Sequence, residues 1–125
     1  MEKEWKIIFY RDDTGISEFE EFVKTLSDKD KDKVEAIVEL LKEKGIGLHR
    51  PYSDILKDGI HELRIKLSRG DTRTLYFFIF ETYIILTHTF YKRTNEVPDS
   101  EINKALKYKQ DFLSKYNKDN IKKDL

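Results

Sequence analysis

The distribution of apolar residues along the chain predicts four strands and three helices. Short blocks rich in aliphatic and aromatic residues, typical of strands, occur once near the N-terminus and three times in succession in the middle of the chain. Blocks in which apolar residues recur every third or fourth position, typical of amphipathic helices, follow the first strand twice and the last strand once. We therefore predict strands over residues 4–10, 61–67, 72–80 and 83–91, helices beginning at Ser17, Ser27 and Asp99, and a loop over residues 46–60.

The first two predicted helices have recognisable ends. Ser17 precedes Glu20 by three residues, the spacing of a capping box. Ser27 offers a second helix start, and Gly45 marks the end of that helix. Because the link between the helices is only a few residues long, we predict a helical hairpin.

The three central strands follow one another too closely for parallel pairing. Turns near Gly70 and at Glu81 make their neighbours antiparallel. The resulting order, β-α-α-β-β-β-α, predicts an α+β fold in which an antiparallel sheet carries the helical hairpin on one face and the C-terminal helix on the other. We expect a single domain over residues 1–116 and a charged, frayed tail over residues 117–125.

Composition narrows the classes of function. The 125 residues suffice for one domain and include 24 basic and 24 acidic side chains but no cysteine. Zero net charge argues against strong nonspecific binding to nucleic acid, but it is compatible with a local basic groove. Without cysteine, and with three histidines that lack metal-ligand spacing to carboxylates, we expect no metal and no cofactor. No stretch resembles a signal peptide or a membrane span, so we expect a cytoplasmic protein without membrane contact.

Basic residues occupy one face of the strand over residues 61–67. Alternation directs its leucines and isoleucine towards one face, and Glu62, Arg64 and Lys66 towards the other. A two-residue turn, at 69–70 or 70–71, places Arg73 on this second face. A three-residue turn would place it in the core, which the cost of burying a charge disfavours. We therefore expect Arg73 to be exposed beside Arg64 and Lys66.

More basic and aromatic residues follow the last strand, in THTFYKRTNEVP. Alternation places His88 and Lys92 on one face and Tyr91 and Arg93 on the other, although strand twist could bring all four to one rim. Guanidinium and ammonium groups neutralise phosphates and aromatic rings stack on bases, so the group suits RNA. On pattern alone, however, charged residues alternating along a strand are usually a solvated face, and His88 is more often a partly buried histidine than a catalytic one.

Two motifs carry a resemblance to a known family. LKDGIHELR, followed by an arginine at the start of an aromatic strand, and HTFYKRTNEVPDSEINKA together resemble the phage-derived, HigB/RelE-like toxins of type II toxin–antitoxin systems. The matching positions are Leu56, Gly59, Glu62, Leu63, Arg64, Arg73, His88, Phe90, Lys92, Arg93, Thr94, Pro98, Glu101, Ile102 and Ala105. The resemblance spans residues 5–113 and implies a RelE-like fold. One departure is Thr72, where an aromatic residue commonly precedes the arginine.

The resemblance implies a ribosome-dependent mRNA endonuclease that a cognate antitoxin inhibits. The antitoxin is expected to be a small helix-turn-helix protein encoded next door. Cleavage without metal uses the RNA 2′-OH as nucleophile and needs a base, an acid and cations on the phosphate. Arg64 and Arg73 suit the phosphate clamp, and Glu62 suits their orientation. The remaining candidates are Lys92, Tyr91 and His88 for catalysis, and Lys66, Arg69 and Arg93 for RNA binding.

Two other functions fit the same resemblance. ParE-like toxins share the fold and bind DNA gyrase without catalysis, and they need no basic clamp. An inactive relative that only binds its antitoxin is the third possibility. The basic positions favour the nuclease, but they do not decide which residue is the base and which the acid.

Overall fold

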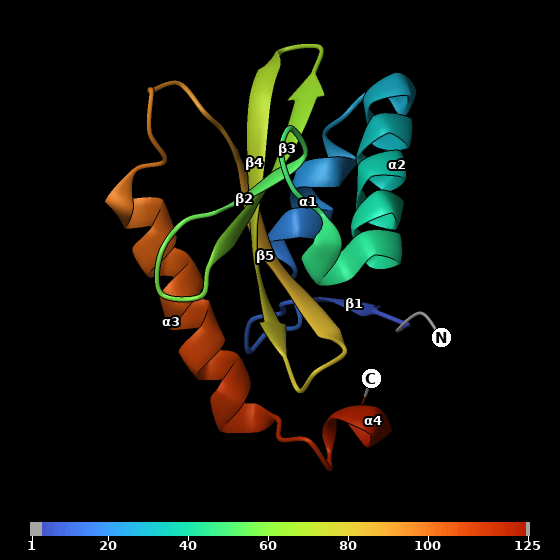
Figure 1. Ribbon diagram of the computed structural model, residues 1–125, viewed down its shortest axis with the longest axis vertical. Helices are drawn as coiled ribbons and strands as arrows, with labels where there is room; N and C mark the ends of the chain where they lie inside the picture. The colour runs from blue at the N-terminus through green and yellow to red at the C-terminus, as the bar shows by residue number, and fades with distance from the viewer. Residues whose placement is uncertain (1–3, 125) are drawn as a thin grey trace.

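The computed structural model describes residues 4–124, and its elements follow the predicted order (Figure 1). In chain order they are β1 (Lys6–Phe9), α1 (Glu18–Lys24), α2 (Asp28–Lys44), the short 3₁₀ helix η1 (Gly45–Gly47), β2 (Ser53–Ile55), β3 (His61–Leu67), β4 (Gly70–Ile79), β5 (Tyr83–Tyr91), α3 (Asp99–Lys115) and α4 (Ile121–Asp124). The α+β class, the helical hairpin and the C-terminal helix are confirmed. Strand β2 lies in the segment predicted to be a loop.

The five strands form one mixed sheet in the order β1-β5-β4-β3-β2. Strands β3, β4 and β5 pair antiparallel as predicted, β2 adds a further antiparallel strand beside β3, and β1 pairs parallel with β5. Parallel pairing needs a long connection, and the chain between β1 and β5 includes both hairpin helices and three strands. The expectation of a wholly antiparallel sheet is therefore corrected at β1.

The turn between β3 and β4 lies at Ser68 and Arg69, so neither turn position considered above is right. Arg64 is the register partner of Arg73, and Leu67 that of Gly70. Asp30 of α2 fixes this turn, because its carboxylate accepts hydrogen bonds from the Ser68 N–H (3.2 Å) and hydroxyl (2.9 Å). The two-residue length is as predicted, so Arg64 and Arg73 do share a face.

Helices cover both faces of the sheet (Figure 1), and each face has its own core. The helical hairpin covers one face, where Leu63, Ile65, Leu67, Tyr76, Ile84 and Leu86 are buried with Phe19, Val34 and Leu41 of the helices. Helix α3 covers the other face, where Leu75, Phe77 and Ile85 are buried with Ile102, Ala105 and Phe112. Both predictions about which helices cover which face are confirmed.

A β-bulge in β5 determines which side chains face α3. Leu75 pairs with His88 but Tyr76 pairs with Leu86, so Thr87 is the extra residue. The Thr87 hydroxyl donates to the Leu75 carbonyl at 2.8 Å. One extra residue reverses the alternation of side chains. The bulge therefore turns His88, Phe90 and Lys92 towards α3.

The tail expected to fray contains the short helix α4. Ile121 is fully buried in the second core, beside Tyr10 and Tyr83. Within residues 4–124, no helix is long and apolar enough to cross a membrane.

Candidate functional site

A cleft of about 340 Å³ opens between the edge of the sheet and the segment that leads into α3. Strands β2 and β3 form one wall, and the β5–α3 loop and the start of α3 form the other. Its lining residues are Asp54, Ile55, Leu56, Lys57, Glu62, Arg64, Lys92, Asn95, Glu96, Val97, Asp99 and Ile102. We call this hollow the Arg64 cleft.

Glu62 is the buried centre of the Arg64 cleft. Its side chain is 3% exposed, and its Oε1 atom accepts hydrogen bonds from the Nε atoms of Arg64 (3.0 Å) and Arg73 (3.2 Å). Arg64 and Arg73 are register partners and would otherwise repel each other. The shared carboxylate offsets this repulsion and orients both guanidinium groups, as expected for Glu62.

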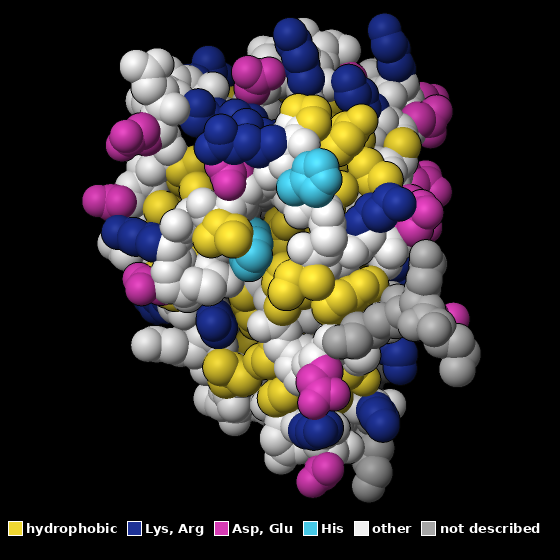
Figure 2. Space-filling view, in the orientation of Figure 1, with side chains coloured by type: hydrophobic (Ala, Val, Ile, Leu, Met, Phe, Trp, Pro, Cys, Tyr) yellow, Lys and Arg dark blue, Asp and Glu magenta, His cyan; other side chains and the backbone are white. Residues whose placement is uncertain are grey.

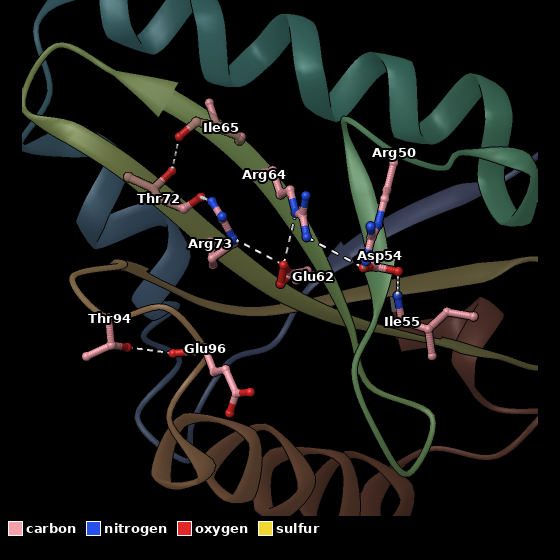
Figure 3. A network of polar contacts seen from close by, with 10 residues as sticks. All are labelled: Arg50, Asp54, Ile55, Glu62, Arg64, Ile65, Thr72, Arg73, Thr94 and Glu96. Atoms are coloured by element: carbon pink, nitrogen blue, oxygen red, sulfur yellow. Dashed lines mark hydrogen bonds and ion pairs between the residues drawn. The ribbon is translucent and has the colours of Figure 1, made fainter.

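Arg64 has a second acidic neighbour on β2. The Asp54 Oδ2 atom lies 3.5 Å from Arg64 Nη2 and accepts hydrogen bonds from Arg50 Nε (2.9 Å) and Nη2 (2.6 Å). The pKa of Asp54 is lowered. The causes are the hydrogen bonds that Asp54 accepts from Arg50 and from the Ile55 N–H, together with the positive charge of Arg64. Figure 3 shows the resulting row of alternating charge, Arg50–Asp54–Arg64–Glu62–Arg73, running across three strands.

Arg73 is buried, which corrects the expectation of an exposed arginine. Its side chain is 10% exposed, and Nη1 donates to the Thr72 carbonyl at 3.0 Å. The reason is its place on the central strand β4, where Arg64 flanks it on β3 and Phe90 on β5. Arg73 supports Glu62 from behind and does not line the cleft.

Lys92 lines the Arg64 cleft directly after β5. Its backbone N–H donates to the Asp71 carbonyl at 2.8 Å, which fixes the start of the loop. Lys57, across the cleft, pairs with Asp99 at 3.2 Å. Lys92 by contrast makes no ion pair with any of residues 4–124, so its ammonium group is available to an anion.

His88 lies beneath α3 and does not line the cleft. Only 2% of the residue is exposed. Its Nε2 atom is 3.2 Å from a Glu101 carboxylate oxygen, and its ring lies against Phe90 and Tyr108. Burial lowers the pKa of His88, as does the charge of Lys104, so the ring is neutral at pH 7.

The other predicted site residues are spread around the molecule. The Tyr91 ring packs on Phe22 of α1, 5.5 Å between centroids, and the Arg93 guanidinium lies 5.8 Å from the Tyr91 ring. Strand twist therefore does not bring Tyr91 to the rim of the cleft. Lys66 and Arg69 are exposed near the β3–β4 turn. Of the predicted catalytic residues, only Arg64 and Lys92 line the cleft, with Arg73 behind them.

Asp54 and Arg50 were missed because residues 46–60 were predicted to be a loop. A signal for β2 was present, since Asp58-Gly59 between apolar residues is a strong indication of a hairpin. Asp58 and Gly59 both have positive φ, 54° and 81°, as a two-residue type I′ turn requires. Read as a hairpin, this segment would have predicted a strand beside β3, although a two-residue turn would place Asp54 opposite Leu63, one residue from its observed partner Glu62.

The comparisons with known proteins agree with this architecture. A sheet with a helical hairpin on one face and the C-terminal helix on the other is consistent with a RelE-like α+β fold. The family model of the phage-derived protein Gp49-like family (DUF891) matches residues 21–110, which include the whole Arg64 cleft. The chain belongs to this family, which is RelE-like and toxin-like. No curated protein matches the chain.

No group of three histidine, aspartate or glutamate side chains within residues 4–124 is placed to share a metal ion.

Proposed function

We propose that this chain is the HigB-like toxin of a type II toxin–antitoxin system and cleaves translated mRNA on the ribosome. The observation that carries the proposal is the Arg64 cleft. There a half-buried arginine and Lys92, which has no ion-pair partner in the part of the chain that the structure describes, face the same open volume. Membership of a toxin-like family supports the biological setting. The proposed partners are a cognate antitoxin, encoded next door, and the ribosome with its mRNA, which places the protein in the cytoplasm.

The proposed reaction is attack of an RNA 2′-oxygen on the adjacent phosphorus. The bond from phosphorus to the 5′-oxygen breaks, leaving a 2′,3′-cyclic phosphate and a 5′-hydroxyl. Arg64 and Lys92 stabilise the negative charge that grows on the phosphate oxygens. Glu62 and Arg73 hold Arg64 in position.

Two proton transfers accompany this step. The groups that line the cleft and can make them are the Lys92 ammonium and carboxylates such as that of Glu96, which makes no ion pair within residues 4–124. In this proposal a carboxylate takes the 2′ proton, and Lys92 gives a proton to the leaving 5′-oxygen. His88 and Tyr91, which lie outside the cleft, act through packing.

One observation favours a noncatalytic toxin, such as a ParE-like gyrase poison. The cleft holds four carboxylates, of Asp54, Glu62, Glu96 and Asp99, against the cations of Lys57, Arg64 and Lys92. This small excess of carboxylates suits contact with a protein better than contact with a polyanion. An inactive relative that binds only its antitoxin has the same surface.

Induced expression of the chain separates these functions. The nuclease should create new mRNA 5′ ends within codons, and these should disappear when translation initiation is blocked. Arg64→Ala should reduce this cleavage roughly a hundredfold or more, since it removes a charge contact to the transition state. Arg11→Ala is the matched control, because Arg11 is an exposed arginine that pairs with one carboxylate, Glu20, far from the cleft.

Two results would contradict the proposal. Growth arrest with intact mRNA and gyrase-linked DNA breaks would identify the noncatalytic toxin. Cleavage of naked RNA as efficient as that of translated mRNA would contradict dependence on the ribosome. We expect poor cleavage of naked RNA because a chain with zero net charge gains little from counterion release.

A further inference from the structure

A second hollow, of about 660 Å³, lies next to the Arg64 cleft at the edge strand β2. The segment from η1 to β2 lines one side, and His61, Tyr76 and Phe78 of β3 and β4 supply aromatic side chains. Ile46 and Ile55, both strongly exposed, also line it. Figure 2 shows histidine side chains set among hydrophobic ones on the face towards the viewer. We call this hollow the His61 pocket.

The His61 pocket has an aromatic surface made by the partly exposed rings of His61 and Phe78, which pack against the buried Tyr76. The His61 ring stacks on Tyr76, with centroids 5.2 Å apart and planes 23° apart. Phe78 meets His61 edge-on, at 5.0 Å and 89°. Such a surface accepts another planar ring with little regard to its identity.

His61 also brings unused hydrogen-bonding capacity. Neither of its ring nitrogens bonds to any of residues 4–124. Burial lowers the pKa of His61, so at pH 7 the ring offers one donor and one acceptor. A ring with polar edges, rather than an aliphatic side chain, would use both its stacking face and these nitrogens.

Asp54 lines both the His61 pocket and the Arg64 cleft. Its carboxylate lies between Arg50, whose side chain is 73% exposed, and Arg64. The two guanidinium groups therefore lie on either side of one anionic position. A phosphate diester that replaced Asp54 as their partner would connect the two hollows along one strand.

The edge of β2 is closed to a peptide strand. The N–H groups of Ser53 and Ile55, which point away from β3, are already bonded to the His49 carbonyl (3.2 Å) and to Asp54 Oδ1 (2.9 Å). An edge whose donors are satisfied does not invite a further strand. This disfavours a protein partner that would bind here by extending the sheet.

We propose that the His61 pocket binds a nucleobase of the same RNA strand whose scissile phosphate lies in the Arg64 cleft. The base stacks on His61, and Arg50 contacts the phosphate between the two hollows. The inference rests on the proposed function and deepens it, because it assigns a site that selects or orients a neighbouring nucleotide.

Photochemical crosslinking tests this assignment without any cleavage. The probe is a hexanucleotide, 2′-O-methylated throughout to remove the nucleophile, that carries one 4-thiouridine. With the thiouridine moved along the probe, one position should label residues 45–61 and another residues 92–99. Labelling of residues 45–61 supports the pocket even if the wild type proves inactive, in which case only the nuclease proposal fails.

Affinity for the same probe provides the second measurement. Arg50→Ala should weaken binding roughly fivefold to tenfold, through loss of a phosphate contact, and His61→Ala at least about fivefold, through loss of stacking. Arg11→Ala should leave the affinity unchanged. Labels confined to residues 92–99, or equal affinities for Arg50→Ala and Arg11→Ala, would overturn the inference. If the probe labels none of residues 45–61 and the antitoxin protects these residues, the pocket binds a protein, and the inference is overturned as well.

Discussion

At the scale of single residues, the arrangement around Glu62 explains why two arginines can stand side by side on adjacent strands. A carboxylate removed from water needs compensation, and Glu62 receives it from both Nε atoms. The two arginines nevertheless have different surroundings. Arg64 is about one third exposed at the cleft, whereas Arg73 is enclosed within the sheet. One should serve the site and the other the fold.

Substitution of the two arginines should therefore separate activity from stability. Arg73→Ala should lower the free energy of unfolding by about 3 kcal/mol, because it leaves Glu62 with one partner fewer at a place in the sheet that water does not reach. Arg64→Ala should lower it by about 1 kcal/mol or less, because solvent screens that pair. Urea denaturation of the two variants measures the difference. Equal losses would show that Arg73 is as exposed in solution as the strand pattern predicts.

His88 should make stability depend on pH. Its folded pKa is lowered by burial and by Lys104, against an ordinary value near 6.5. The unfolded chain then binds a proton that the folded chain does not, so stability is lost as pH falls through about 6.5. The slope reaches at most about 1.4 kcal/mol per pH unit for one histidine. His61, whose pKa burial also lowers, adds in the same direction.

Urea unfolding between pH 7.5 and 5.5 measures this slope, above the range where carboxylates titrate. His88→Gln should flatten it relative to wild type, whatever its effect on stability at pH 7.5. His49→Gln, at an exposed histidine, is the control and should keep the wild-type slope. An unchanged slope in His88→Gln would mean that His88 is protonated in the folded protein.

At the scale of elements, polar contacts attach α3 to Tyr10, just after β1, and to Glu18 at the start of α1. Glu18 accepts hydrogen bonds from Lys104 (2.9 Å) and from the Tyr108 hydroxyl, so its carboxylate faces α3. Further along α3, the Tyr10 hydroxyl donates to Asp111 at 2.6 Å. Burial and the Asp111 charge raise the pKa of Tyr10, which keeps the phenol protonated as a donor. Helix α3 is thus fixed at two positions.

Removal of one such contact should loosen α3. Tyr10→Phe keeps the ring stacked on Tyr108 but deletes the hydroxyl, and it should cost about 1.5 kcal/mol of stability. Tyr116→Phe is the control, because the Tyr116 hydroxyl has no hydrogen-bond partner within residues 4–124. Thermal unfolding and amide exchange in α3 measure both variants. If the two substitutions cost the same, the Tyr10–Asp111 bond contributes nothing to holding the helix.

Elements governed by local chemistry were predictable from the sequence, and those governed by distant partners were not. Ser17 and Ser27 cap their helices as expected, each accepting from the N–H three residues on. By contrast, the bulge at Thr87 depends on how β5 meets β4, and the turn at Ser68 depends on Asp30 of α2. The candidate site was partly predictable for the same reason. Alternation placed Arg64 correctly, but burial of Arg73 followed from its central position in the sheet.

At the scale of the whole molecule, the two faces differ in what they offer to a partner. The face with α3 carries the Arg64 cleft. The helical hairpin carries an apolar groove of about 480 Å³, where Phe9, Phe19, Val23, Val34 and Val38 lie beneath charged residues. Glu20, Glu35 and Glu39 line this groove with Lys24 and Lys31. A basic, amphipathic antitoxin segment would bury these apolar side chains and pair with the glutamates.

We therefore expect the antitoxin to bind the helical hairpin and to block entry into the ribosome sterically. Hydrogen exchange of the free toxin and the complex should show strong new protection in residues 17–44 and little change in residues 61–76. Glu35→Lys and Glu39→Lys should each weaken the complex by reversing a charge at the groove. Glu43→Lys, exposed on α2 outside the groove, should not. Protection confined to residues 61–76 and 88–94 would instead show that the antitoxin fills the Arg64 cleft, where the acidic residues of an inhibitor would compete with Glu62 and Asp54 for Arg64.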